Sequence, residues 1–223
     1  VLRVLRAKQK AGLFARPYTE AAPERQRAPE HVALAVSLAC QSAVLLKNDG
    51  VLPLAASLKT VAVLGPYAEA RRQHLGSWCL DGRPADVTPI LDGLRAELPE
   101  IRFRTANPAF SDEMMAVARN ADLTILCVGE SHVRNGEAKS ISELSLPPGQ
   151  EELIESFGRL GLPLVVVDCS GRFLPIPAAE RYARAILHAG SLGTEAGTAV
   201  ARLLSGAANP SGKLPMTIPR TTG

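Results

Sequence analysis

A polar segment from Gly129 to Leu146 carries most of the side chains in this sequence that could perform acid–base chemistry. It follows an apolar run, Asp122 to Val128, and contains three glutamates, one histidine and two cations: Glu130, Glu137, Glu143, His132, Arg134 and Lys139. A polar connection of this length inside a compact domain is more often functional than not. We therefore treat this segment as the candidate site. The alternative is that its charges are simply solvated.

Carboxylates in this setting suit one reaction class in particular. Glycoside hydrolysis needs one carboxylic acid to protonate the leaving oxygen and a second carboxylate to attack the sugar or to activate water. The segment from Gly129 to Leu146 could supply one of the two.

Four further features have simpler interpretations. Trp78, the only tryptophan, suits stacking on a sugar ring but equally suits packing. The Gly193–Gly197 stretch opens a helix and could cradle an anion, although a tight turn that brings backbones close explains it as well. Asp168 is expected to pair with Arg172, and His188, at the end of an apolar strand, is expected to be a buried histidine with its hydrogen bonds satisfied.

The elements that must position these residues alternate along the chain. Short apolar runs predict buried strands, and segments with helical spacing of apolar residues predict the helices between them. The strands are expected at Thr60–Gly65, Ile101–Thr105, Asp122–Val128, Pro163–Asp168 and Ala183–Ala189, and the helices at about Asp86–Leu98, Ser111–Asn120, Gln150–Leu160 and Thr194–Leu204. This alternation predicts an α/β fold, with a doubly wound, mostly parallel sheet flanked by helices. Ligands of such sheets bind beyond the carboxyl ends of the strands.

The two ends of the chain differ from this pattern. Val1 to Gly12 is expected to be a basic helix, followed by a polar linker, so that residues 1–29 form an arm and residues 30–223 form the α/β domain. A helix is expected from Glu30 through Lys47. The start without methionine, inside a helix, suggests that the chain is a fragment. The proline-containing stretch Asn209–Pro219 is expected on the surface or at a sheet edge.

Composition argues against several classes of protein. Hydrophobic residues make up 46% and charged residues 21%, with a net charge of +3 and 4% aromatics. Nucleic-acid binding normally needs a basic face, so it is not expected, and no apolar run is long enough to span a membrane. The cysteines lack CxxC spacing, and the histidines lack metal-ligand spacing. Cys127 and Cys169 lie in apolar runs and are expected to be buried free thiols.

Several sequence strings together resemble the segment of bacterial family 3 glycoside hydrolases, of the β-glucosidase type, that runs from the end of the barrel through the second domain. The strings occur in the family's order: Gly12–Phe14 with Pro17–Tyr18, Ser42–Leu54, Val63–Pro66, Leu75–Trp78, Gly129–Ser131, Glu143–Pro147, Gly193–Gly197 and Asn209–Pro215. Each is weak alone, but the ordered set covers nearly the whole chain.

The resemblance implies a six-stranded α/β sandwich packed against a TIM-like barrel that is not part of this chain. It implies a retaining β-glycosidase acting on β-linked oligosaccharides or glucosides, with an aspartate nucleophile on the barrel and no metal or organic cofactor. By its place in the loop, Glu137 matches the general acid/base; Glu130 is the second choice. Ser77, Trp78 and Arg134 are the expected substrate-binding residues. The chain departs from the family at Ile141, where relatives often carry an arginine. By itself it is expected to be inactive.

Two other functions stay open at this point. The chain could be a stand-alone carbohydrate-binding or scaffold module, since it has a whole core but no nucleophile. It could also be a nucleotide-binding domain, although no phosphate-cradling sequence is present.

Overall fold

The computed structural model describes residues 1–18, 27–109 and 111–221. By its internal contacts the chain divides into two units, Val1–Val32 and Ala33–Gly223. The first contains helix α1 (Leu2–Lys10), which has no buried residue, and the start of helix α2 (Pro29–Ser42). The predicted boundary at residue 30 lies three residues before this division, and the predicted linker falls largely on residues 19–26, which lie outside the described residues.

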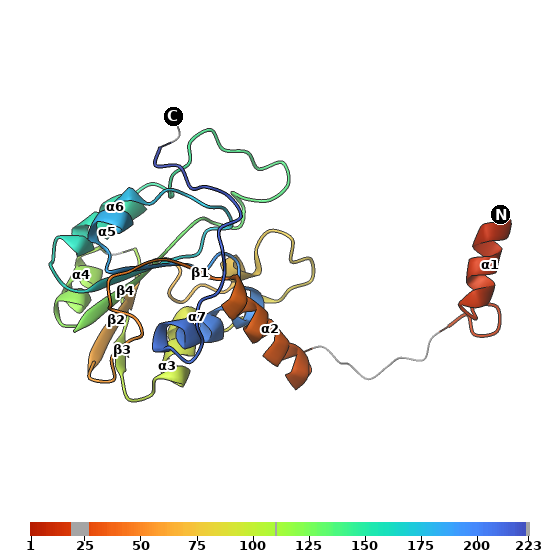
Figure 1. Cartoon of the computed structure of the whole chain (residues 1–223), viewed down its shortest axis with the longest axis horizontal. Coiled ribbons are helices and arrows are strands. Elements are labelled where there is room, and N and C mark those ends of the chain that lie inside the picture. The colour runs from red at the N-terminus through yellow and green to blue at the C-terminus, as the bar shows by residue number, and fades with distance from the viewer. Residues whose placement is uncertain (19–26, 110, 222–223) are drawn as a thin grey trace. The chain divides into compact units, whose positions relative to one another are not determined.

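The second unit contains a six-stranded sheet in the order β1-β6-β5-β4-β2-β3 (Figure 1). Its strands are β1 (Val44–Asn48), β2 (Thr60–Leu64), β3 (Arg102–Arg104), β4 (Leu123–Val128), β5 (Leu164–Asp168) and β6 (Ala185–His188). Strands β2 to β6 pair in parallel, and β1 pairs antiparallel with β6. The predicted doubly wound, mostly parallel sheet is confirmed.

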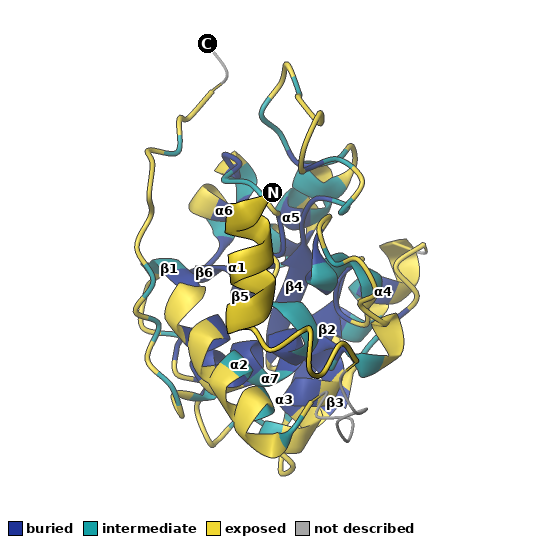
Figure 2. Cartoon of the chain, turned by 90° about the vertical axis from the view of Figure 1, so that its right-hand side faces the viewer, coloured by how far each residue is buried: buried dark blue, intermediate teal, exposed yellow. Residues whose placement is uncertain are grey.

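Helices cover both faces of the sheet, and each face has its own core (Figure 2). Side chains alternate along a strand, so Val61 and Val63 of β2 face one core while Ala62 and Leu64 face the other. The first core lies under α2, α3 (Ile90–Glu97) and α7 (Ala196–Ser205), and the second lies under α4 (Ser111–Arg119), α5 (Gln150–Gly158) and α6 (Pro177–Tyr182). Such burial on both faces explains why the strands are continuous apolar runs.

The predicted helix through Lys47 is wrong at its end. Helix α2 stops at Ser42, whose hydroxyl donates to the carbonyl of Leu38, and Val44–Asn48 forms the edge strand β1. Leu45 and Leu46 fit helical spacing, but pairing with the open edge of β6 satisfies the backbone of this segment instead. Tertiary pairing therefore overrides the local pattern.

Short segments complete the domain. Among the described residues, 3₁₀ helices occur at Arg72–Leu75, Pro84–Asp86 and Gly193–Glu195. The C-terminal segment passes along the β1 side of the sheet, where Gly212 N–H donates to Ala43 carbonyl at 3.2 Å, in agreement with the predicted surface or edge position (Figure 1). No described helix has the length and apolarity needed to cross a membrane.

Candidate active site at the carboxyl ends of the strands

Four parallel strands deliver their following loops to one edge of the sheet. Strands β2, β4, β5 and β6 end there at Leu64, Val128, Asp168 and His188, and the register aligns the last three of these residues. After β2 the chain first adds β3 on one side of β2 and then adds β4, β5 and β6 in turn on the other side. The position between β2 and β4 is therefore a topological switch point. Crevices at such points are the usual ligand sites of open α/β sheets.

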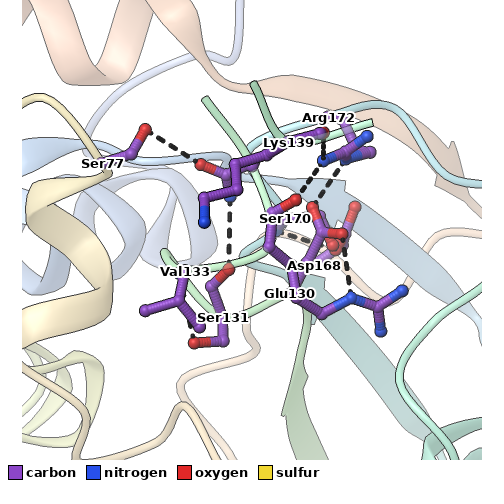
Figure 3. A network of polar contacts seen from close by, with 10 residues as sticks. Ser77, Glu130, Ser131, Val133, Lys139, Asp168, Ser170 and Arg172 are labelled. Atoms are coloured by element: carbon purple, nitrogen blue, oxygen red, sulfur yellow. Dashed lines mark hydrogen bonds and ion pairs between the residues drawn. The ribbon is translucent and has the colours of Figure 1, made fainter. Parts of the chain in front are cut away.

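The loop after β4 is anchored by a buried carboxylate. Glu130 is 1% exposed, and its Oε2 lies 2.8 Å from Nε of Arg172 (Figure 3). Its Oε1 lies 3.4 Å from Nε of Arg134. The Arg172 guanidinium also donates to the backbone carbonyls of Arg134 and Lys139. One guanidinium thus joins the loop to the end of β5 and offsets the charge of Glu130.

A second anchor holds the start of the loop. The Gln150 side chain accepts from Gly129 N–H at 2.7 Å and donates to the Gly129 carbonyl at 2.9 Å. A β-carbon on Gly129 would come within 2.7 Å of the backbone of Cys169, so only glycine fits between β4 and β5 here. The start of the loop is therefore fixed by hydrogen bonds on one side and by backbone contact on the other.

The middle of the loop lies against the segment that follows β2. Ser77 Oγ donates to Asn135 Oδ1 at 3.2 Å. A β-carbon on Gly136 would lie 2.5 Å from Ser77 Oγ and 3.8 Å from Trp78 Nε1, and one on Gly171 would lie 2.5 Å from the Asn135 amide. Two glycines thus permit the close approach that brings the loop beside Ser77 and Trp78.

This approach encloses a hollow of about 380 Å³, which we call the Glu137 hollow; its lining residues are Arg72, Ser77, Trp78, His132, Val133, Asn135, Glu137 and Lys139. Glu137 is exposed, and so is 67% of Trp78. Partial burial and the nearby charge of Arg72 lower the pKa of His132. Among the described residues that line the hollow, Glu137 is the one carboxylate, with cations around it. Because Glu137 is exposed in this hollow, a bound ligand could reach its carboxyl group, which a proton donor requires.

The structure brings together three of the predicted site residues and separates the others. Glu137, Ser77 and Trp78 share one hollow. Arg134 pairs with Glu130 and lines a different hollow, beside Ser140–Leu146. Ile141, where related enzymes often carry an arginine, lines the same hollow as Arg134.

The predicted pairing of Asp168 with Arg172 is wrong. Asp168 Oδ2 lies 2.7 Å from Nδ1 of His188, while its Oδ1 accepts from the N–H and the hydroxyl of Ser170. Arg172 instead turns to Glu130. Asp168 and His188 end neighbouring parallel strands in register, and strand pairing, not sequence distance, decides which partner is near. His188 is buried, as predicted, and Cys127 and Cys169 are buried and free, as predicted.

Sequence reasoning missed Arg72 and Asn135 as residues of the hollow. Asn135 carried a usable signal, because an asparagine before a glycine in a strand-end loop often supplies side-chain hydrogen bonds to the backbone. Arg72 had none, since it lies on a 3₁₀ helix far away in sequence.

Comparisons with known protein families, sequences and structures all point to the same family. The profile described as the glycosyl hydrolase family 3 C-terminal domain matches residues 43–223. A β-xylosidase of Formosa agariphila is 36% identical over 99% of this chain and 33% of its own length. A periplasmic β-glucosidase of Salmonella typhimurium is 34% identical over 99% of this chain and 34% of its own. A β-glucosidase of Listeria innocua, solved with isofagomine, superposes with a TM-score of 0.90 at 34% identity, over 99% of this chain and 32% of that one. The chain spans about a third of the length of these relatives.

Proposed function

The chain belongs to glycoside hydrolase family 3 as its C-terminal domain, and on this premise we propose that it supplies the general acid/base, Glu137, of a retaining β-glycosidase. The enzyme would remove terminal non-reducing sugars from β-glycosides. The relatives named above are a β-xylosidase and two β-glucosidases, and a mutant of the Listeria enzyme has been solved with laminaribiose. Glucosides and xylosides are therefore the first substrates to test.

One observation carries the assignment of Glu137. It is the sole carboxylate among the described residues that line a hollow at the switch point of the sheet, and an exposed tryptophan lines the same hollow. Glu130 has the opposite environment: it is buried and its two oxygens face two guanidinium groups. A group held in that way is poorly suited to exchange protons with a substrate, so we assign Glu130 to the loop anchor.

The proposed mechanism requires a partner carboxylate from the barrel domain. That aspartate would attack the anomeric carbon while Glu137 protonates the leaving oxygen, and Glu137 would then remove a proton from the water that hydrolyses the glycosyl-enzyme. Retention of configuration requires the two carboxyl groups to lie about 5 Å apart. Trp78 would stack on the leaving group, and the Glu130–Arg172 pair would keep the loop, and so Glu137, in place.

The test is Glu137→Gln in the complete polypeptide that contains this chain. We expect turnover of disaccharides to fall about 10²- to 10⁴-fold, the usual contribution of general acid–base catalysis. Added azide should restore part of the rate on 4-nitrophenyl glycosides, because their leaving group needs no proton and azide needs no base. Glu143→Gln is the matched control, since Glu143 is an exposed glutamate of the same loop that does not line the Glu137 hollow.

Glu130→Gln separates the two candidates. As a loop anchor, Glu130 should lower the midpoint of thermal unfolding when it is replaced, and azide should restore nothing. If Glu130→Gln shows azide rescue and Glu137→Gln keeps full activity, the roles assigned above are reversed.

A further inference from the structure

The Asp168–His188 pair has no role in the mechanism above, yet several hydrogen bonds fix its geometry. Asp168 is 1% exposed, and three donors face it: Ser170 N–H at 3.0 Å, Ser170 Oγ at 2.5 Å and His188 Nδ1 at 2.7 Å. The His188 ring packs on Phe173, with ring centroids 4.5 Å apart. The imidazole is therefore fixed in position and in orientation.

This arrangement also fixes which nitrogen of His188 is available. When Nδ1–H donates to Asp168, Nε2 is left as the second polar atom of the ring. Within the described part of the chain, the side-chain hydrogen bond of His188 is the one from Nδ1 to Asp168, which leaves Nε2 available. A β-carbon on Gly190 would stand 3.7 Å from Nε2, so the absence of a side chain at residue 190 leaves this nitrogen uncovered.

His188 and Gly190 both line a second hollow, of about 390 Å³, which we call the His188 hollow. Ser77, Trp78 and Asn135 line both this hollow and the Glu137 hollow, so the two adjoin along these residues. Its volume is within the range of small-molecule sites. A sugar whose glycosidic oxygen is protonated by Glu137 is therefore close enough to extend into the second hollow.

The lining of the His188 hollow suits a neutral, polyhydroxylated ligand. Trp78 and Phe173 offer aromatic surface, while Ser77, Ser191 and Asn135 offer hydroxyl and amide groups. Arg172 also lines the hollow, but Glu130 and backbone carbonyls engage its guanidinium. Polar and apolar groups alternate around this hollow, and a sugar ring, with hydroxyls at its edge and C–H groups on its faces, matches such a mixed lining.

We propose that His188, held by Asp168, is a specificity-determining residue that hydrogen-bonds a hydroxyl of the sugar ring on the leaving-group side of the scissile bond. This inference rests on the proposed function, because it takes Glu137 as the group that protonates the leaving oxygen. It adds a substrate class: glycosides whose leaving group is itself a sugar are favoured over those with a leaving group that lacks hydroxyls.

The test compares two replacements of His188 in the complete polypeptide. His188→Asn can still donate to Asp168 but has no atom at the Nε2 position, whereas His188→Gln can place a polar atom there. For each, kcat/KM is measured on a disaccharide, the one cleaved fastest among laminaribiose, cellobiose and xylobiose, and on the 4-nitrophenyl glycoside of the same sugar. The ratio of the two values cancels effects on folding and on the shared chemistry.

We expect His188→Asn to lower this ratio about tenfold, the effect of one lost hydrogen bond to an uncharged group. His188→Gln should recover part of it. Gly190→Ala is a second variant that leaves His188 intact and covers Nε2; it should lower the ratio in the same direction, and it serves if His188→Asn does not fold.

An unchanged ratio in His188→Asn and Gly190→Ala would overturn the inference, as would a wild-type enzyme that cleaves the nitrophenyl glycoside but no disaccharide. An equal fall on both substrates would assign His188 a purely structural role. These outcomes are distinct from failure of the proposed function, in which Glu137→Gln retains full activity whatever His188 does.

Discussion

At the scale of single residues, Glu130 and Glu137 belong to one loop but differ in burial and in charged neighbours, and we assign them different roles. Glu130 lies at the base, where burial would be costly for a carboxylate without its two guanidinium partners. Glu137 lies seven residues later, exposed beside Trp78. The same side chain is thus a structural anchor at one position and a candidate proton donor at the other. Their types were visible in the sequence, but the burial that separates them was not.

A buried histidine makes stability depend on pH. His74 is 1% exposed, its Nε2 has no hydrogen-bond partner among the described residues, and burial lowers its pKa to about 4 although a hydrogen bond with the Tyr67 backbone opposes the shift. Between pH 4 and about 6.5 the unfolded chain binds a proton here that the folded chain does not. Stability therefore rises with pH across this window and falls as pH drops through it.

We expect His74 to make the domain about 2 kcal/mol less stable at pH 5 than at pH 7, from the difference between the folded and unfolded pKa values. Urea unfolding of wild type and His74→Leu at both pH values measures this. The variant should lose that part of the pH dependence, while His31→Gln, at an exposed histidine, should keep it. An identical pH dependence in wild type and His74→Leu would contradict the expectation.

At the scale of elements, the contact between α3 and α7 depends on two glycines. A β-carbon on Gly197 would lie 2.0 Å from the carbonyl oxygen of Pro89, and one on Gly93 would lie 2.2 Å from the backbone of Gly197. Gly197 N–H also donates to the Thr88 carbonyl at 2.9 Å. The Gly193–Gly197 stretch is therefore the tight turn and close backbone approach that the sequence suggested as its simpler interpretation.

Gly197→Ala should destabilise the domain by about 1–3 kcal/mol, the usual effect of overpacking, because backbone atoms cannot move aside as a flexible side chain would. Alanine's better helix propensity offsets about 1 kcal/mol at most. The measurement is the free energy of unfolding in urea. Arg202→Ala on the same helix is the control: its side chain is half exposed, and its 4.0 Å ion pair with Glu97 contributes little. A variant as stable as wild type would show that α3 and α7 separate easily.

Also at this scale, elements that depend on a local pattern of apolar residues were predictable from the sequence, whereas contacts that depend on strand pairing were not. The strands β2, β4, β5 and β6 were predictable because each is an apolar run buried on both faces. Strand β1 was not, since Leu45 and Leu46 also fit a helix and only the edge of β6 decides between the two. The Asp168–His188 contact was missed for the same reason, because register brings the two together across 20 positions.

At the scale of the whole molecule, the proposed function makes the described residues one half of an active site. The two hollows adjoin at Trp78, so one tryptophan could contact both the reacting bond and the leaving group. The chain spans about a third of its relatives, and the family profile describes this part as a C-terminal domain. The sequence resemblance implies that the second carboxylate lies on a barrel domain, and this stays a prediction; among the described residues, Glu137 is the one carboxylate that lines its hollow.

The proposed function therefore predicts that the 223-residue chain alone binds sugars weakly and hydrolyses none. Retaining hydrolysis needs two carboxyl groups about 5 Å apart, and within the described residues no carboxylate other than Glu137 lines its hollow. Release of 4-nitrophenol from β-glucoside and β-xyloside substrates should equal the rate in buffer for the chain alone and exceed it greatly for the complete polypeptide. Because Trp78 is the only tryptophan of this chain, its fluorescence reports binding to the chain in the same samples.

Quenching by glucose or cellobiose without hydrolysis, in both the chain and the complete polypeptide, would instead favour a carbohydrate-binding module. Turnover by the chain alone that Glu137→Gln abolishes would mean that a second carboxylate of this domain completes the site.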